Sequence, residues 1–314
     1  RWLPVLVGSP DWTRSIDAQP PSAPDPAVFA AFASAFAQRY GAAVDHYQIG
    51  DEPNLYDAWG SDPRPAAYAA LLQAAYTAIH AADAEAQVIA AALAPTVESG
   101  PRNISDLIYL DDLYRLGLAD FSDGIAAKPY GFGFAPDDRE FDPANPAELK
   151  FARIAALRAV MLRHDDNHTP LWASSFGWNH LPSDWSGQPS IWGQVSQEAQ
   201  QAYTLDALRI AEQEWTWLGG LILENWQPPQ SATAADARWG FALITPDGTP
   251  TPLYALLAAR PSSTAAPPGL HFPASPFAAY TGVWTFGDLG ADLGWVNDSQ
   301  ATFTFSGTDI SLLL

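Results

Sequence analysis

The chain has 314 residues, with 15 Lys and Arg against 35 Asp and Glu, and therefore a formal net charge of −20. This acidity argues against nucleic acid and anionic membranes as partners, because both need basic side chains to neutralise phosphate. There is no cysteine, so no disulfide framework or thiolate metal site is expected. No apolar run has the length of a membrane helix, and we expect no membrane insertion, no metal and no cofactor.

Short apolar runs typical of buried strands alternate with helical patterns along the chain. The expected strands are 3–7, 47–49, 88–93, 124–127, 171–173 and 220–223. The expected helices are 26–40, 68–79, 104–116, 149–162, 203–217 and 253–259. This alternation predicts parallel strands joined by crossover helices, which defines the α/β class.

The composition changes after the last expected helix. Residues 261–272 are rich in Pro, Ser and Ala, which is typical of a stiff polar linker. Residues 301–305 alternate polar and apolar side chains, and a Ser-Gly turn separates them from 310–312, which predicts a hairpin. We therefore expect a (β/α) domain at 1–260, a linker at 261–272, and a partial β-rich accessory domain at 273–314 that begins a β-sandwich.

The end of the second expected strand carries the most informative motif. Residues 47–54 read Tyr-Gln-Ile-Gly-Asp-Glu-Pro-Asn. They resemble the W-N-E-P-N motif on the fourth strand of the clan A glycoside hydrolases, retaining (β/α)8-barrel enzymes with an acid/base and a nucleophilic carboxyl. The resemblance implies that Glu52 is the acid/base and that Asp51 and Asn54 contact substrate. Because Asp51 adjoins Glu52, we expect one of these two carboxyls to have a raised pKa.

A lysine and a tyrosine follow the fourth expected strand. Residues 123–131 read D-G-I-A-A-K-P-Y-G, which is similar to the family pattern D-x-I-x-x-H-P-Y-G. The resemblance implies that Tyr130 orients the nucleophile through its hydroxyl, and Lys128 stands where the family has histidine. Lys128 has two alternatives: an internal ion pair with Asp51 and Glu52 that blocks the subsite, or an extended side chain that reaches solvent.

The fifth expected strand decides the prediction about catalysis. Residues 171–178 read L-W-A-S-S-F-G-W and resemble the family pattern W-I-T-E-F-G-W, whose glutamate is the nucleophile. The nucleophile position holds Ser175, and serine cannot replace a carboxylate without an activating base. The serine is either an engineered change or natural divergence. Asp51 and Lys128 depart from the pattern as well, which favours natural divergence.

The sixth expected strand leads to Trp226, which the resemblance implies is the floor of the sugar subsite, with Trp178 as a second contact. Glu224 is a further carboxyl near the rim that, together with Glu52, offers a route to an inverting arrangement. The fold implied is a TIM-type (β/α)8 barrel that lacks its first two strands in this chain. We expect a protein partner or a missing N-terminal segment to cover the open side.

These patterns predict a glycosidase-like protein that is catalytically impaired and binds an oligo- or polysaccharide. One alternative is an active O-glycosyl hydrolase that cleaves β-linked substrates with Glu52 as acid/base. Another is a structural or assembly component that reuses the barrel fold. An extracellular or cell-surface location is expected.

Overall fold

The computed structural model describes residues 2–8, 10, 24–140, 149–228 and 232–259, and in the tail residues 278–281, 284–287, 290–293, 300–303, 305, 307, 310 and 311. The chain forms two compact units. Unit 1 is Arg1–Gly177 with Gly219–Glu224, and unit 2 is Trp178–Leu218 with Asn225–Leu314. The linker expected at 261–272 lies outside the described residues, and the expected division at residue 260 stays a prediction.

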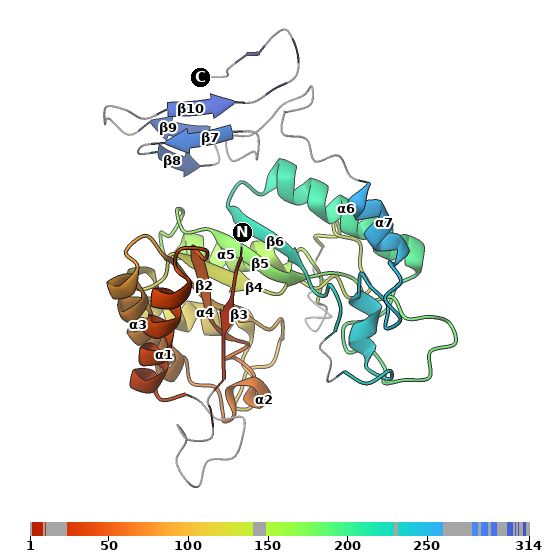
Figure 1. Ribbon diagram of the computed structural model, residues 1–314, viewed down its shortest axis with the longest axis horizontal. Coiled ribbons are helices and arrows are strands. Elements are labelled where there is room, and N and C mark those ends of the chain that lie inside the picture. Colours follow the sequence, from red (N-terminus) through yellow and green to blue (C-terminus); the bar gives the residue numbers. More distant parts are fainter. Residues whose placement is uncertain are drawn as a thin grey trace. The chain divides into compact units, whose positions relative to one another are not determined.

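Unit 1 is built on a six-stranded parallel sheet with the strands in chain order (Figure 1). The strands are β1 (Val5–Leu6), β2 (His46–Asp51), β3 (Gln87–Leu93), β4 (Gly124–Ala127), β5 (Leu171–Phe176) and β6 (Leu218–Leu223). The helices between them are α1 (Pro26–Tyr40), α2 (Tyr56–Trp59), α3 (Pro65–Ala82), α4 (Asp106–Arg115), the 3-10 turn η2 (Leu118–Asp120) and α5 (Arg153–Arg163). The expected α/β class and partial barrel are confirmed.

The two faces of β2 pack against different partners, because successive side chains of a strand point in opposite directions. Tyr47 is fully buried, and its ring meets that of Phe36 on α1 edge-on at 6.1 Å. His46 faces the other way, and its ring lies 5.0 Å from that of Trp172 on β5. Helices therefore cover one face of the sheet, where α1 and α3 lie side by side (Figure 1).

Trp172 fills the inner face of the sheet next to β6. A Cβ atom on Gly219 would lie 2.5 Å from the indole nitrogen of Trp172, and one on Gly220 would lie 2.7 Å from its ring. Both distances are shorter than any real contact, so the two glycines allow the β6 backbone to approach the indole. The Gly-Gly pair that follows the first residue of β6 is thus complementary to a large aromatic residue on the neighbouring strand.

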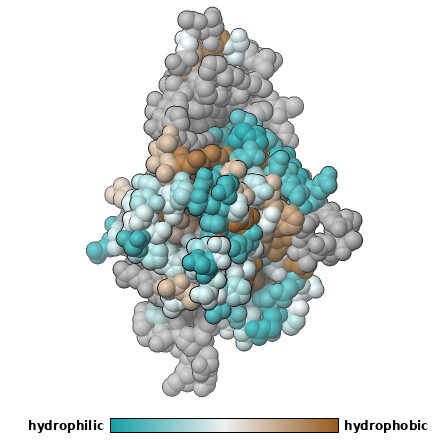
Figure 2. All heavy atoms as spheres, turned by 90° about the vertical axis from the view of Figure 1, so that its right-hand side faces the viewer, coloured by the Kyte–Doolittle hydropathy of each residue, from teal (hydrophilic) through white to brown (hydrophobic). Residues whose placement is uncertain are grey.

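The outer strands β1 and β6 each have one neighbour, so the sheet is open. The described residues place no strand beside their free edges. Next to β1, the side chains of Trp2 and Val7 are exposed by 74% and 54%. β1 is shorter than the expected strand 3–7, because its register with β2 covers only two residue pairs. On the face that Figure 2 shows, apolar side chains lie among hydrophilic ones.

Unit 2 contains α6 (Gln197–Glu214), the 3-10 helix η3 (Ala237–Phe241) and α7 (Pro252–Ala258). Its tail has four short strands: β7 (Ala278–Thr281), β8 (Trp284–Gly287), β9 (Gly290–Leu293) and β10 (Gln300–Phe303). β10 lies in the strand predicted near residue 301, but the prediction of its partner is wrong. It pairs antiparallel with β7, whereas Ile310 and Ser311 lie outside any strand.

No helix in the described ranges combines the length and the apolar character that crossing a membrane requires.

Buried tyrosines make unit 1 sensitive to alkali. Burial raises the pKa of Tyr68, Tyr109, Tyr114 and Tyr130, and nearby carboxylates reinforce the shift for Tyr114 and Tyr130. Tyrosine in an unfolded chain ionises at about pH 10. The stability that these groups contribute is therefore complete below about pH 10 and is lost as the pH rises toward their folded values.

When the protein is titrated above about pH 10, we expect the absorbance of ionised tyrosine at ~295 nm to rise. The rise should be cooperative and should coincide with the loss of circular dichroism. The chain in guanidinium is the control, in which all 11 tyrosines should titrate together. Smooth ionisation of every tyrosine near pH 10 with the fold intact would contradict this expectation.

Candidate functional site

The carboxyl ends of four strands bring the candidate polar residues together in unit 1. Asp51 is the last residue of β2 and Glu52 follows it, while Lys128 directly follows β4. Ser175 is the penultimate residue of β5, and Glu224 directly follows β6. This edge of the sheet is where active sites of parallel barrels lie.

The backbone is constrained at the end of β2. Glu52 has φ of 48°, in the left-handed region that a non-glycine residue rarely adopts. Its amide donates to the carbonyl of Ala92 on β3 over 2.8 Å, which fixes this conformation against the neighbouring strand. Gly50 has φ of 82°, which glycine adopts readily. Strain of this kind persists where the surrounding structure enforces it, often at functional sites.

Lys128 forms the internal ion pair, the first of its two expected alternatives. Its Nζ atom lies 2.8 Å from Oδ2 of Asp51 and 2.8 Å from Oε1 of Glu52. The lysine side chain is only 12% exposed, whereas those of Asp51 and Glu52 are 37% and 27% exposed. The ammonium therefore bridges the two adjacent carboxylates and does not reach out into solvent.

Burial and charge act against each other in this cluster. Burial alone would lower the pKa of Lys128, but the charges of Glu52 and Asp51 outweigh it and hold that pKa above its ordinary value. Burial raises the pKa of Asp51; Lys128 opposes the shift, while Glu52 and Glu224 reinforce it. One of the two adjacent carboxyls thus has a raised pKa, as the sequence predicts, with burial as its largest cause.

Glu224 is held by two hydroxyl groups. The Tyr130 hydroxyl donates to Oε2 of Glu224 over 2.6 Å, and the Ser175 hydroxyl donates to the same oxygen. The Glu224 amide donates to the carbonyl of Phe176 over 2.9 Å, which sets its backbone beside the end of β5. The tyrosine that the family resemblance assigns to the nucleophile therefore contacts Glu224.

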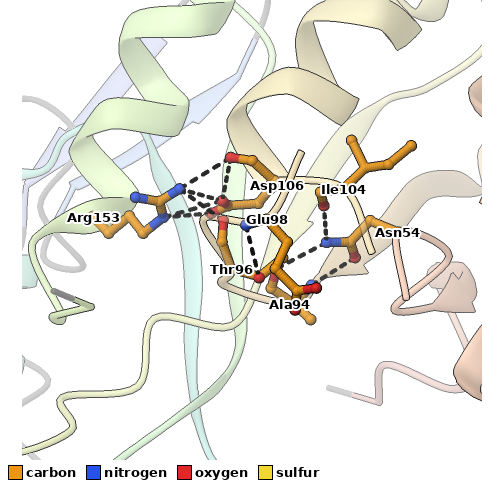
Figure 3. Close-up of polar contacts among 8 residues, drawn as sticks. Asn54, Ala94, Thr96, Glu98, Ile104, Asp106 and Arg153 are labelled. Carbon is orange, nitrogen blue, oxygen red and sulfur yellow. Dashed lines mark hydrogen bonds and ion pairs between the residues drawn. The ribbon is translucent and has the colours of Figure 1, made fainter. Parts of the chain in front are cut away.

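Asn54 anchors a loop. Its side-chain nitrogen donates to the carbonyls of Ala94 and Ile104 over 2.9 Å each, and its oxygen accepts from the Ala94 amide (Figure 3). Asn54 is fully buried, so the expected direct contact with substrate does not fit this structure. These bonds tie the turn after Glu52 to the segment that follows β3.

The two candidate tryptophans in unit 2 differ in exposure. Trp178 is 1% exposed and packs 5.7 Å from the ring of Tyr203, so the expected sugar contact does not fit it either. Trp226 is 61% exposed, with its ring edge-on to Tyr254 at 5.5 Å. Only Trp226 has a free face for stacking, and its role as a subsite floor stays a prediction.

Sequence reasoning missed the ion pair that supports the strand-end loops. Arg153 on α5 contacts Asp106 on α4, and it also donates to the carbonyl of Thr96 in the loop after β3 (Figure 3). Opposite charges 47 positions apart carry no local signal. Among the described residues, no group of three or more His, Asp or Glu side chains is arranged to hold a metal ion.

No protein-family model and no curated protein sequence matches the chain. Solved structures do match it in fold. A monomeric β-xylosidase from Caulobacter crescentus CB15 has a TM-score of 0.55 and 19% identity, over 81% of this chain and 52% of its own. A family 39 glycoside hydrolase from the gut symbiont Bacteroides cellulosilyticus WH2 has a TM-score of 0.51 and 19% identity, over 74% of this chain and 44% of its own.

Unit 1 is a partial (β/α) barrel, and the chain is similar in fold to these glycoside hydrolases over part of their length. The chain spans about half the length of these two solved structures.

Proposed function

We propose that this protein binds a neutral β-linked oligo- or polysaccharide at the strand-end site and is impaired as a hydrolase of unactivated glycosides. The observation that supports this proposal most directly is the position of the Lys128 ammonium between Asp51 and Glu52. The fold similarity to glycoside hydrolases supports the choice of ligand class. The net charge of −20 argues against acidic glycans.

The ion pair opposes the acid step of glycoside cleavage. A general acid must carry a proton and give it to the leaving oxygen. A carboxylate oxygen that accepts a hydrogen bond from an ammonium group acts as an acceptor and not as a proton donor. Glu52 accepts a hydrogen bond from Lys128 through Oε1, so the candidate acid/base is engaged with a cation. The strand that carries the family nucleophile has Ser175 in its place. Both steps of the family mechanism are therefore weakened.

Calorimetric titration with neutral xylo- and gluco-oligosaccharides tests the binding. We expect saturable binding, and we expect Asp51→Ala to weaken it about 10-fold, because a charged hydrogen bond contributes roughly 1.5–3 kcal/mol. Asp138→Ala is the matched control, since Asp138 also pairs with a lysine, Lys150, over 2.9 Å. Release of reducing ends from the same oligosaccharides measures turnover in parallel.

Each outcome of this experiment has a meaning. Binding without appreciable release of reducing ends supports the proposal. Hydrolysis at an ordinary glycosidase rate, about 1–10³ per second, would replace it with the active-enzyme alternative. If no oligosaccharide binds and none is cleaved, the structural or assembly role is favoured instead.

A further inference from the structure

We infer that Glu224, which directly follows β6, is the nucleophilic carboxylate of this site and takes the role that Ser175 on the neighbouring strand cannot perform. This inference rests on the proposed function, because it requires a glycoside in the strand-end site. It goes further by assigning the reacting atom and the kind of glycoside that is cleaved.

The first support is the way in which Glu224 is held. Tyr130 and Ser175 both donate to Oε2, and the backbone of Glu224 is bonded to Phe176. Among the described residues, no hydrogen bond reaches Oε1 of Glu224. One oxygen is thus fixed by two donors and the other is left to meet a ligand. A nucleophile needs this orientation, because a misplaced reacting atom slows the reaction steeply.

The second support is the position of the carboxylate. Ser175 stands at the family's nucleophile position, and its hydroxyl touches the Glu224 carboxylate. The side chain of Glu224, which is longer than that of serine and follows the adjacent strand β6, therefore brings a carboxylate to the place beside Ser175. Tyr130, whose expected task is to orient the nucleophile, donates to that same carboxylate.

The third support is the type of donor. Burial and the charge of Glu224 raise the pKa of Tyr130, so its hydroxyl stays protonated and keeps donating at neutral pH. Two hydroxyl donors therefore hold Oε2 of Glu224 in place. A carboxylate with one oxygen fixed by two donors has the fixed orientation that a nucleophile needs.

The reaction then proceeds in two displacements. Oε1 of Glu224 bonds to the anomeric carbon, the bond from this carbon to the leaving oxygen breaks, and its electron pair departs with that oxygen. A dinitrophenolate departs as a stable anion, whereas an alkoxide needs a proton, and the candidate acid Glu52 is engaged in an ion pair with Lys128. Water next attacks the anomeric carbon of the glycosyl ester, and a carboxylate of the site accepts its proton. The bond from this carbon to Oε1 breaks, and its electron pair stays on Glu224, which is again a free carboxylate. Turnover is thereby limited to glycosides with good leaving groups.

Trapping of the ester tests this assignment. The probes are dinitrophenyl β-glycosides of xylose, glucose and galactose in which fluorine replaces the hydroxyl next to the anomeric carbon. We expect intact mass to increase by one fluoroglycosyl group, and peptide mapping to place the group on Glu224. Glu224→Gln should slow labelling on the order of 10³-fold or more.

Glu85→Gln is the matched control, because Glu85 is an exposed glutamate before the start of β3, at the amino end of the strands and outside the site, so labelling of this variant should match that of the native protein. Tyr130→Phe and Ser175→Ala alter positioning residues, and they should slow labelling while leaving the reversible binding of oligosaccharides unchanged. A label on Asp51 or Glu52 would overturn the inference.

Reversible binding of the probes without a covalent adduct would also overturn it, and the proposed function would stand. Absence of any binding would remove the proposed function and this inference with it. Labelling of the native protein needs no variant, so misfolding of a substituted chain does not affect the assignment.

Discussion

Replacement of Arg153 by methionine should lower the free energy of unfolding by about 3–5 kcal/mol, because it leaves a buried carboxylate without its cation. The arginine Nη2 atom lies 2.6 Å from Oδ1 of Asp106, and Nε lies 3.0 Å from both carboxylate oxygens (Figure 3). The side chains of Arg153 and Asp106 are 9% and 2% exposed. Urea denaturation followed by tryptophan fluorescence measures the loss.

Arg115→Met is the matched control. Arg115 also pairs with aspartates, Asp111 and Asp112, but its side chain is 66% exposed. An exposed pair of this kind contributes less than about 1 kcal/mol. Equal losses in the two variants would show that the pair between α4 and α5 is no more important than a surface contact. Adding Asp106→Leu to Arg153→Met should recover part of the loss, since it removes the unpaired charge.

Replacement of Lys128 by methionine should increase the hydrolysis of glycosides with poor leaving groups on the order of 10²-fold, the usual contribution of a general acid. Without the ammonium, Asp51 and Glu52 are adjacent carboxylates, and their repulsion favours a proton on one of them. The donor is the protonated form, so the gain should be largest at acidic pH and should vanish as the pH rises through the pKa of that carboxyl. Rates on alkyl and dinitrophenyl glycosides, measured across pH, give the result.

Lys128→Arg is the control for this change. It retains a cation between Asp51 and Glu52, so hydrolysis of alkyl glycosides should stay as low as in the native protein. Dinitrophenyl glycosides should respond little to either variant, because their cleavage does not require an acid. A folded Lys128→Met protein with unchanged rates on alkyl glycosides would show that the ion pair is not what limits the acid step.

Local patterns predicted much of the fold. Strand-like runs are short and apolar, and α1 has a clear start signal, the Asp25 side chain that caps its first turn. The same local patterns predicted that Asp51 and Glu52 lie at the end of a strand. The substrate contacts expected for Asn54 and Trp178 do not fit their burial, because exposure depends on the segments that pack over a residue. Ala94 and Ile104, which bind Asn54, lie 40 and 50 positions away.

The amino-acid sequence by itself determined the alternation of strands and helices, the strand-end positions of the polar residues, and the presence of a serine where a nucleophile is expected. Periodicity and short motifs carry this information, because neighbours in the chain decide it. Only the tertiary structure decided that Lys128 bridges Asp51 and Glu52, 77 and 76 positions away. It alone also placed Tyr130 on Glu224, 94 positions away. Contacts of this range depend on the order and register of the strands in the sheet, which fix the side chains that meet at its edge.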